Sequence, residues 1–288
     1  MKTRIISGIV MGAIVAAVLT AGLLWNSIVI AVFVALLAAG AVYELVHNVA
    51  KIQSKAAWLG ACVYTAVETF TLLYNWIETP AYVTLKSYIT PRDEWGYKLT
   101  ALAVITVIYF IYSVIMVLVN HKEMTLGAIG MLSAMPLFVV MAFSCLGSVI
   151  NHENGLYYLL MLFNFSSICD MGAYFVGVTC GKHKLCPQIS PKKTVEGAVG
   201  GILSAVIFAI VFMLAFSQTD KLISTLILTV PLCIVGMMGD LFASSIKRSV
   251  GLKDYSNLIP GHGGVLDRVD SILLISPVMY LCMLLGVL

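Results

Sequence analysis

The segment 99–119 reads LTALAVITVIYFIYSVIMVLV and contains no charged residue. A helix that crosses the hydrocarbon core of a bilayer needs about 20 apolar residues, so this segment is long enough to span a membrane. Similar segments recur along the 288 residues, of which 60% are hydrophobic and 11% are charged. Soluble domains carry about 25% charged residues. The sequence therefore predicts an all-α, polytopic integral membrane protein and excludes a water-soluble fold.

Eight further segments contain enough apolar residues to be membrane-spanning helices. The first follows Lys2 and Arg4, and because another apolar run follows it directly, an uncleaved span is favoured over a cleaved signal peptide. The third is the weakest, because it contains Glu68. The nine predicted spans cover residues 5–24, 27–46, 57–76, 99–119, 125–149, 155–178, 197–216, 222–244 and 270–288.

The basic residues indicate how these spans are oriented. Cytoplasmic loops of membrane proteins carry an excess of Lys and Arg. With the N-terminus in the cytoplasm, 13 of the 17 basic residues fall on the cytoplasmic side, and the segment 77–98, to which we assign no role, lies outside. We therefore predict a cytoplasmic N-terminus and an external C-terminus. The cytoplasmic residues are Lys2, Arg4, Lys51, Lys55, Lys122, Lys182, Lys184, Lys192, Lys193, Lys247, Arg248, Lys253 and Arg268.

Polar residues are concentrated in the C-terminal half. The predicted cytoplasmic loops 179–196 and 245–269 are dense in charged residues, whereas the first five spans are mainly aliphatic and aromatic. We therefore expect a transmembrane scaffold over 1–150 and a transmembrane catalytic region over 151–288, with its active site at the cytoplasmic face. The seven cysteines form no CxxC pair and no zinc spacing, so we interpret them as small apolar filler residues in a reduced compartment.

Four carboxylates fall within the predicted spans or at their ends. A charged side chain at mid-membrane costs roughly 2.5–3.5 kcal/mol on insertion scales, so such residues usually face a cavity, a partner or an ion. Glu44 and Glu68 lie near a span end or in the weakest span, where snorkelling or protonation accounts for them. Asp170 and Asp240 lead into the two polar loops and are therefore functional candidates.

The segment 240–270 combines acids, bases and glycines. If a helix continues past Asp240, Ser244 and Lys247 lie on the same face. Asp267 and Asp270 share a face at the start of the last span, and a Pro-Gly-His-Gly-Gly turn at 260–264 lies between the two helices. Carboxylates suit Mg²⁺, and cations and glycine amides suit phosphate oxygens. A loop that binds anionic headgroups non-specifically would explain the basic residues but not the aspartates or the glycines.

The segment 190–197 reads SPKKTVEG and resembles a helix start, with Ser190 as N-cap and Pro191 at the first position. Lysines, a hydroxyl group and free amides at a helix N-terminus form an anion site. A capped helix with positive-inside lysines explains the segment about equally well. Gly197, Gly200 and Gly201 indicate close helix packing.

These patterns define candidate residues for three roles. For His262, contact with phosphate or a structural role is favoured over acid–base chemistry, because a phosphate monoester is already ionised at neutral pH. The catalytic candidates are Asp240, Asp267, Lys247, Arg248 and His262, the metal candidates are Asp240, Asp267 and, as a second choice, Asp270, and the anion-binding candidates are Ser190, Lys192, Lys193, Thr194 and Glu196.

At these residues the sequence resembles the phosphatidate cytidylyltransferase family, also called CDP-diacylglycerol synthases. The family pattern runs Ser-x-apolar-Lys-Arg, four residues, Lys-Asp, then Pro-x-His-Gly-Gly, then Asp-Arg-apolar-Asp. Residues 244–248, 253–254, 260–264 and 267–270 occupy every position of it. The stretches 170–177, 181–182 and 190–197 agree as well, so the specific match covers about 160–275. Val178 stands where a basic residue is expected.

The resemblance implies transfer of a cytidylyl group from CTP to phosphatidate, giving CDP-diacylglycerol and pyrophosphate in phospholipid biosynthesis. It also implies a requirement for Mg²⁺, a second, monovalent cation such as K⁺, a homodimer in the inner (plasma) membrane, and no nucleic-acid partner. Further substrate contacts implied by the resemblance are Asp170, Tyr174, Lys253, Asp254, Gly263, Gly264 and Arg268.

Two other functions are compatible with the same residues. A related enzyme could use a different lipid phosphate, such as an isoprenoid-ether lipid. A secondary transporter would also have many spans with buried acids, but it would place them at mid-membrane in broken helices. The polar residues of this chain gather at one predicted face, which favours an enzyme at the membrane surface.

Overall fold

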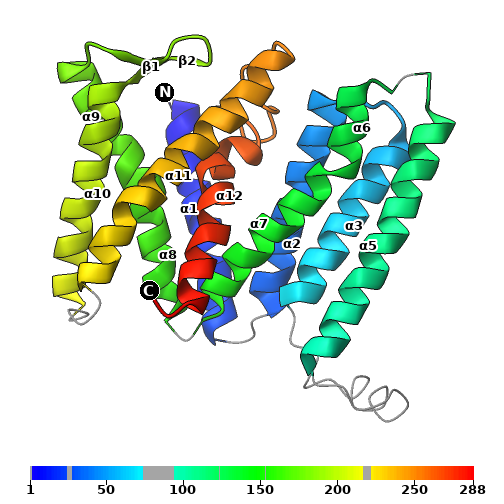
Figure 1. The fold of residues 1–288 in the computed structure, drawn as a ribbon, viewed down its shortest axis with the longest axis horizontal. Helices are drawn as coiled ribbons and strands as arrows, with labels where there is room; N and C mark the ends of the chain where they lie inside the picture. Colours follow the sequence, from blue (N-terminus) through cyan, green and yellow to red (C-terminus); the bar gives the residue numbers. More distant parts are fainter. Residues whose placement is uncertain (1, 25–27, 74–93, 123, 153, 217–221) are drawn as a thin grey trace. The chain divides into compact units, whose positions relative to one another are not determined.

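The computed structural model describes residues 2–24, 28–73, 94–122, 124–152, 154–216 and 222–288 (Figure 1). Most of the described residues are helical, which confirms the predicted all-α membrane fold. Residues 74–93, which contain most of the predicted outer segment 77–98, lie outside the described residues. The count of nine spans and the orientation of the N-terminus remain predictions. Seven helical segments of the described chain are long and apolar enough to cross a membrane: Ile28–Val49, Lys55–Leu73, Thr100–Val119, Leu126–Ile150, Gly155–Cys180, Val195–Ala215 and Leu222–Ser249.

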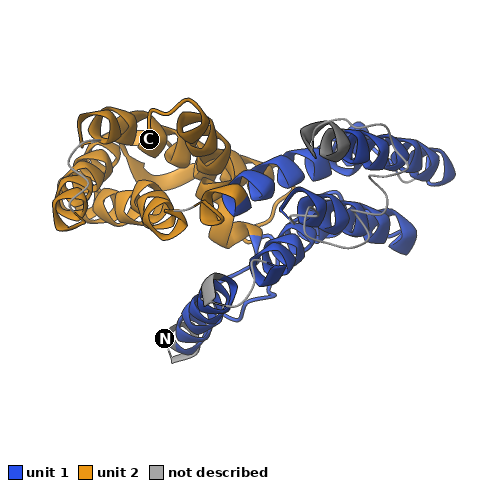
Figure 2. Ribbon diagram, turned by 90° about the horizontal axis from the view of Figure 1, so that it is seen from below, with its two compact units in different colours: residues 1–147, 255–265 blue, residues 148–254, 266–288 orange. Residues whose placement is uncertain are grey.

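The chain forms two compact units (Figure 2). Unit 1 contains residues 1–147 and 255–265, and unit 2 contains residues 148–254 and 266–288. The chain thus leaves unit 2 after Asp254 and returns to it at Leu266. The glycine turn at 260–264 therefore packs with the N-terminal half, although the sequence places it in the C-terminal half. The division of labour between a scaffold and a catalytic region remains a prediction.

Unit 1 is built mainly from helices that pack in chain order, α1 on α2, α2 on α3, and α3 on α5. α3 has a mean hydropathy of 1.3, the lowest of the seven apolar segments, as expected from Glu68. The segment η1 is a wide, π-helical turn that continues α2. The elements are α1 (Lys2–Leu24), α2 (Ile28–Tyr43), η1 (Glu44–Val49), α3 (Lys55–Leu73), α5 (Glu94–Val119), α6 (Leu126–Ser133) and α7 (Met135–Ile150), the last ending in unit 2.

The fifth predicted span is interrupted between α6 and α7 by a proline. Pro136 has no backbone N–H, so it leaves the carbonyl of Leu132 without its usual donor four residues on. The buried hydroxyl of Tyr109, on α5, donates a hydrogen bond to this carbonyl. Because an unsatisfied carbonyl is costly in lipid, the Tyr109 hydroxyl makes the break tolerable and joins α5 to α6.

Unit 2 is arranged around a second π-helical segment, η3, which contacts α8, α9, α10, α11 and α12. The side chain of Asn164, in η3, is fully buried and donates to the carbonyl of Ala205 at 3.1 Å. The elements are α8 (Gly155–Phe163), η3 (Asn164–Ile168), α9 (Cys169–Cys180), β1 (Lys184–Cys186), β2 (Ser190–Thr194), α10 (Val195–Ala215), α11 (Leu222–Ser249) and α12 (Leu266–Leu284).

α9 and α10 approach each other closely through small residues. A Cβ atom at Gly197 would lie 2.7 Å from the carbonyl oxygen of Ala173, and one at Gly201 would lie 2.5 Å from that of Cys169. At Gly200 it would meet the side chain of Val176 at 2.4 Å. The predicted packing role of these three glycines is therefore confirmed.

The predicted helix start at Ser190 is wrong. Residues 190–194 form strand β2, which pairs antiparallel with β1, and α10 begins only at Val195. Thr194 is the N-cap, and its hydroxyl accepts a hydrogen bond from the N–H of Gly197 at 3.1 Å. Pairing with β1 gives the backbone of 190–194 an extended partner, and the Ser-Pro pair therefore does not act as a helix start.

Candidate functional site

Unit 2 contains a cavity of about 660 Å³ bounded by α9, the β1–β2 hairpin, α10 and α11. The lining residues of α9 include Asp170, Tyr174, Gly177 and Val178. Their helical spacing puts them on one face of α9. Ala173, Leu185, Ala198 and Met237 add apolar wall, and the charged and hydroxyl-bearing residues of the lining are Asp170, Tyr174, Lys184, Ser190, Lys192, Lys193, Thr194 and Asp240.

The central polar contact of this cavity is an ion pair between Lys193 and Asp240. Strand β2 supplies the lysine and α11 the aspartate, and each side chain is 25% exposed. Lys193 also lies within electrostatic reach of Asp170, on α9. The hydroxyl of Ser244, one turn beyond Asp240, donates to its carboxylate at 3.4 Å. The pair therefore joins β2 to α11, with Asp170 of α9 nearby, and the cavity carries both signs of charge.

Glu196 holds the hairpin beside the cavity. Its carboxylate accepts hydrogen bonds from the backbone N–H of Lys182 at 3.0 Å and of His183 at 3.1 Å. It also contacts Nδ1 of His183 at 2.6 Å. Glu196 is not among the residues that line the cavity. Its contacts therefore support a role in fixing the cavity wall, and the predicted substrate contact stays a prediction.

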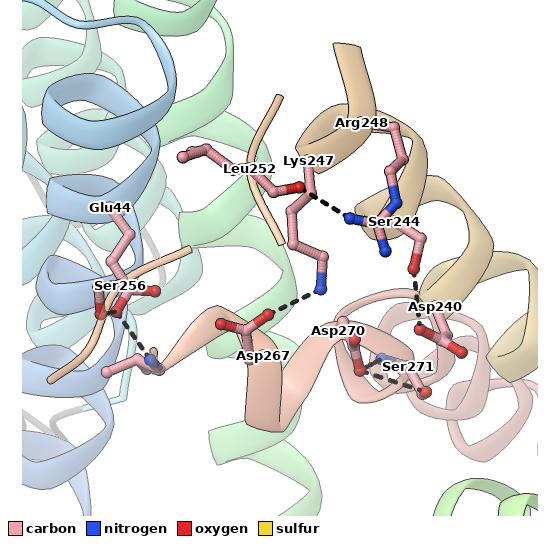
Figure 3. A network of polar contacts seen from close by, with 11 residues as sticks. Glu44, Asp240, Ser244, Lys247, Arg248, Leu252, Ser256, Asp267, Asp270 and Ser271 are labelled. Atoms are coloured by element: carbon pink, nitrogen blue, oxygen red, sulfur yellow. Dashed lines mark hydrogen bonds and ion pairs between the residues drawn. The ribbon is translucent and has the colours of Figure 1, made fainter. Parts of the chain in front are cut away.

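A second ion pair joins α11 to α12 in unit 2 (Figure 3). Nζ of Lys247 lies 2.7 Å from a carboxylate oxygen of Asp267, and their side chains are only 9% and 3% exposed. α11 continues past Asp240 to Ser249, beyond the predicted span end at 244, so the condition that puts Ser244 and Lys247 on the face of Asp240 is met. The Arg248 side chain is exposed and donates to the carbonyl of Leu252 at 2.9 Å, so it closes the end of α11.

The glycine loop 255–265 packs within unit 1. Ile259 and Gly263 exchange backbone hydrogen bonds of 2.8 and 3.1 Å, which close a tight turn. At the tip, Nδ1 of His262 lies 2.8 Å from the hydroxyl of Ser7. Gly263 and Gly264 are buried. Both of the glycines and the histidine that the sequence assigns to substrate or catalysis are therefore ordered by contacts within unit 1.

Three further residues with predicted substrate contacts do not line the cavity of unit 2. Lys253, Asp254 and Arg268 are exposed on the segments that flank the glycine loop. None of the three lines the cavity. Their predicted substrate contacts stay predictions.

The carboxylates of unit 2 bear on the predicted metal site. Asp170, Asp240 and Asp270 come from α9, α11 and α12 and lie within electrostatic reach of one another. Asp270 accepts a hydrogen bond from the N–H of Ser271 at 2.8 Å. Among the described residues, no three His, Cys, Asp or Glu side chains already form a metal cage. This donor set fits Mg²⁺, which typically takes one or two protein carboxylates and fills its other positions with water and phosphate oxygens.

The sequence did not reveal two features, one in the cavity of unit 2 and one in unit 1. Lys184 and Leu185 line the cavity, but only the pairing of β1 with β2 brings them there. Glu44 has no predicted function, yet its carboxylate is 1% exposed and bonds to both ends of the glycine loop. The position of a carboxylate inside an apolar span is the signal that was available for Glu44.

Unit 2 thus presents lysines, carboxylates and apolar wall in one cavity of a polytopic membrane protein, an arrangement suited to a phosphorylated, amphipathic ligand. The chain belongs to the cytidylyltransferase family, which it matches over residues 2–285. It is 40% identical over 127 residues to a phosphatidate cytidylyltransferase of Staphylococcus saprophyticus and 35% identical over 157 residues to one of Bacillus subtilis. These matches cover 44% and 54% of this chain, and 49% and 58% of those proteins. The chain spans about half the length of the curated relatives it matches.

Proposed function

We propose that this chain is a phosphatidate cytidylyltransferase, which converts CTP and phosphatidate into CDP-diacylglycerol and pyrophosphate in phospholipid biosynthesis. The observation that carries the proposal is the cavity of unit 2, where Lys193 and Asp240 pair between β2 and α11. Family membership and the relatives' printed names support the same reaction.

The chemistry needs charge neutralisation more than it needs a base. An oxygen of the lipid phosphate attacks the α-phosphorus of CTP and forms a new P–O bond. The bond between the α-phosphorus and the oxygen that bridges it to the β-phosphate breaks, and pyrophosphate is released. Negative charge grows on the leaving group, and fixed cations that neutralise it lower the barrier. Lys184, Lys192 and Lys193 supply such cations in the cavity. Asp240 keeps Lys193 oriented before the substrate arrives.

An amphipathic lipid substrate fits the wall of the same cavity. Tyr174 and Val178 line the cavity and are 66% and 70% exposed. Phe175, their neighbour on α9, is 63% exposed. A phosphate bound at the lysines would thus lie beside an apolar helix surface suited to acyl chains. The same wall also suits another lipid phosphate, such as an isoprenoid-ether lipid, which remains the alternative substrate.

Mg²⁺ is the proposed cofactor. Asp240 would hold it, with Asp170 and Asp270 as its electrostatic neighbours on adjacent helices. Asp267 is the other proposed ligand, and in this structure it pairs with Lys247. When bound, the ion neutralises phosphate oxygens and aligns the nucleotide for displacement. A monovalent cation such as K⁺ is proposed as a second ion.

We also place the protein in the inner (plasma) membrane, with the cavity facing the cytoplasm where CTP is available, and as a homodimer. The seven apolar helices support a membrane location. The excess of basic residues around the hairpin and the end of α11 supports the cytoplasmic assignment.

The direct test is transfer of label from CTP, radiolabelled at its α-phosphate, into lipid by the purified protein in detergent. Phosphatidate, an isoprenoid-ether lipid phosphate and no lipid form the three arms. We expect Mg²⁺-dependent label in the phosphatidate arm and equimolar release of pyrophosphate. Label only in the isoprenoid arm would reassign the lipid. Absence of transfer in every arm, from protein that is folded and binds CTP, would contradict the proposal.

A further inference from the structure

Glu44 is an unusually well-buried carboxylate in the N-terminal half of the chain. It opens the π-helical turn η1 at the end of α2, and it is 1% exposed. One of its oxygens accepts hydrogen bonds from the hydroxyl of Ser256 at 2.7 Å and from the N–H of Val265 at 2.8 Å (Figure 3). Glu44 thus bonds to both ends of the loop 255–265, which lies more than two hundred residues away in sequence.

Two further contacts also hold the loop 255–265 against η1. The side chain of Asn48, one turn beyond Glu44, donates to the carbonyl of Tyr255 at 2.9 Å. A Cβ atom at Gly264 would lie 2.3 Å from a carboxylate oxygen of Glu44. Only glycine at 264 therefore lets the carboxylate approach this close. Wide helical turns of this kind are frequent at functional sites.

We infer that Glu44 is a positioning residue for the proposed cytidylyl transfer, which acts by fixing the glycine loop. With Ser256 and Val265 bound to one oxygen, the turn at 260–264 has little freedom, and the chain enters α12 from a fixed point one residue before Leu266. α12 carries Asp267 in its first turn and Asp270 three residues further on. The N-terminal half then contributes to catalysis by positioning, through the side chain of Glu44. This inference rests on the proposed function.

The charge of Glu44 is what this role requires. A carboxylate that accepts several hydrogen bonds binds more strongly than a neutral amide. Burial of a charge is costly unless hydrogen bonds compensate for it. Replacement by glutamine keeps the volume and one acceptor oxygen but removes the charge. Glu44→Gln should therefore loosen the loop while leaving the helices of unit 1 packed.

Hydrogen–deuterium exchange on the purified full chain tests this without any substrate. We expect backbone amides of 255–265 to exchange at least about tenfold faster in Glu44→Gln, because both bonds to the carboxylate weaken. The matched control is Glu68→Gln, a 5% exposed carboxylate of the same unit that accepts from Thr106 at 2.8 Å. Glu68→Gln should leave exchange in 255–265 unchanged.

The kinetic arm uses the CTP transfer assay. Glu44→Gln should lower kcat about tenfold or more with little change in KM for CTP, whereas Glu68→Gln should retain wild-type kcat. If Glu44→Gln fails to fold, Ser256→Ala removes the hydroxyl that donates to Glu44 and accepts from the N–H of Leu258 at 3.2 Å. This variant should raise exchange at 255–257, apart from the Leu258 amide itself, and lower kcat in the same direction. Unchanged exchange in the loop, or equal loss of kcat in both glutamine variants, would overturn the inference. A wild-type protein that transfers no label, yet shows faster loop exchange in Glu44→Gln, would instead reject the proposed function.

Discussion

The buried pair of Lys247 and Asp267 predicts that two aspartates with the same proposed role differ sharply in their effect on stability. Asp267→Asn removes the charge opposite Lys247 in a site where the side chains are 9% and 3% exposed. Breaking a buried ion pair by removing one partner costs about 3–5 kcal/mol, and asparagine retains an acceptor oxygen, so we expect about 3 kcal/mol. Asp240→Asn acts on a pair whose side chains are each 25% exposed, where about 1 kcal/mol or less is expected.

Thermal unfolding of both variants in one detergent measures this difference. About 3 kcal/mol corresponds to a fall of roughly 6–12 °C in the unfolding midpoint, against roughly 2–4 °C for Asp240→Asn. The double variant Lys247→Met with Asp267→Leu should recover part of the loss, because an apolar pair of similar volume is often neutral. Equal midpoints for the two asparagine variants, or a double variant no better than Asp267→Asn, would refute the reasoning. The loss of activity in Asp267→Asn must therefore be corrected for the folded fraction before it is attributed to a metal.

Three further predictions concern the cavity, the topology and the α6–α7 break. Lys193→Ala should lower kcat/KM for CTP about ten- to hundredfold, because a charge-assisted contact to phosphate is worth roughly 1.5–3 kcal/mol. The control is Lys182→Ala, because Lys182 does not line the cavity. Equal activities of the two variants would indicate that the lysines only bind lipid headgroups. Ser190→Cys, in a background without native cysteines, should resist membrane-impermeant thiol reagents in intact cells, and labelling from outside would reverse the topology. Tyr109→Phe should destabilise the protein by about 1–3 kcal/mol, because the carbonyl of Leu132 loses its donor; an unchanged unfolding midpoint would contradict that account of the break.

The helices could be predicted from the sequence because lipid imposes a local rule. Backbone groups in the hydrocarbon cannot bond to water, so an apolar run of sufficient length forms a helix that satisfies nearly all of them within its own segment. The segment 99–119 obeys this rule, and α5 covers it. The hairpin does not, because the strand at 190–194 exists only through its partner at 184–186. Ser190 and Pro191 satisfy the local signature of a helix start, and the non-local pairing overrides it.

The candidate site also depends on non-local contacts that local sequence patterns do not predict. Asp170, Lys193 and Asp240 were recognisable by residue type and by their place near polar loops, and the cavity of unit 2 does contain all three. Their mutual arrangement depends on contacts between α9, β2 and α11 that no spacing reveals. For Glu44 the sequence favours snorkelling or protonation over a function, because the carboxylate lies near a span end, whereas its partners Ser256 and Val265 lie far along the chain. Local patterns therefore identified the chemistry of the cavity but not the carboxylate that holds the glycine loop of unit 1.

We propose that the cavity around Lys193 and Asp240 carries out Mg²⁺-dependent cytidylyl transfer. The most direct measurement is the rate of label transfer from CTP to phosphatidate by Asp240→Asn, across a Mg²⁺ titration, beside the wild type and Glu68→Gln. Loss of a supporting group around a metal typically costs 10–100-fold, and loss of a ligand should exceed that. We predict that Asp240→Asn is nearly inactive at ordinary Mg²⁺ while still folded and monodisperse, and that Glu68→Gln matches the wild type. Wild-type transfer and unchanged Mg²⁺ dependence in Asp240→Asn would contradict the account.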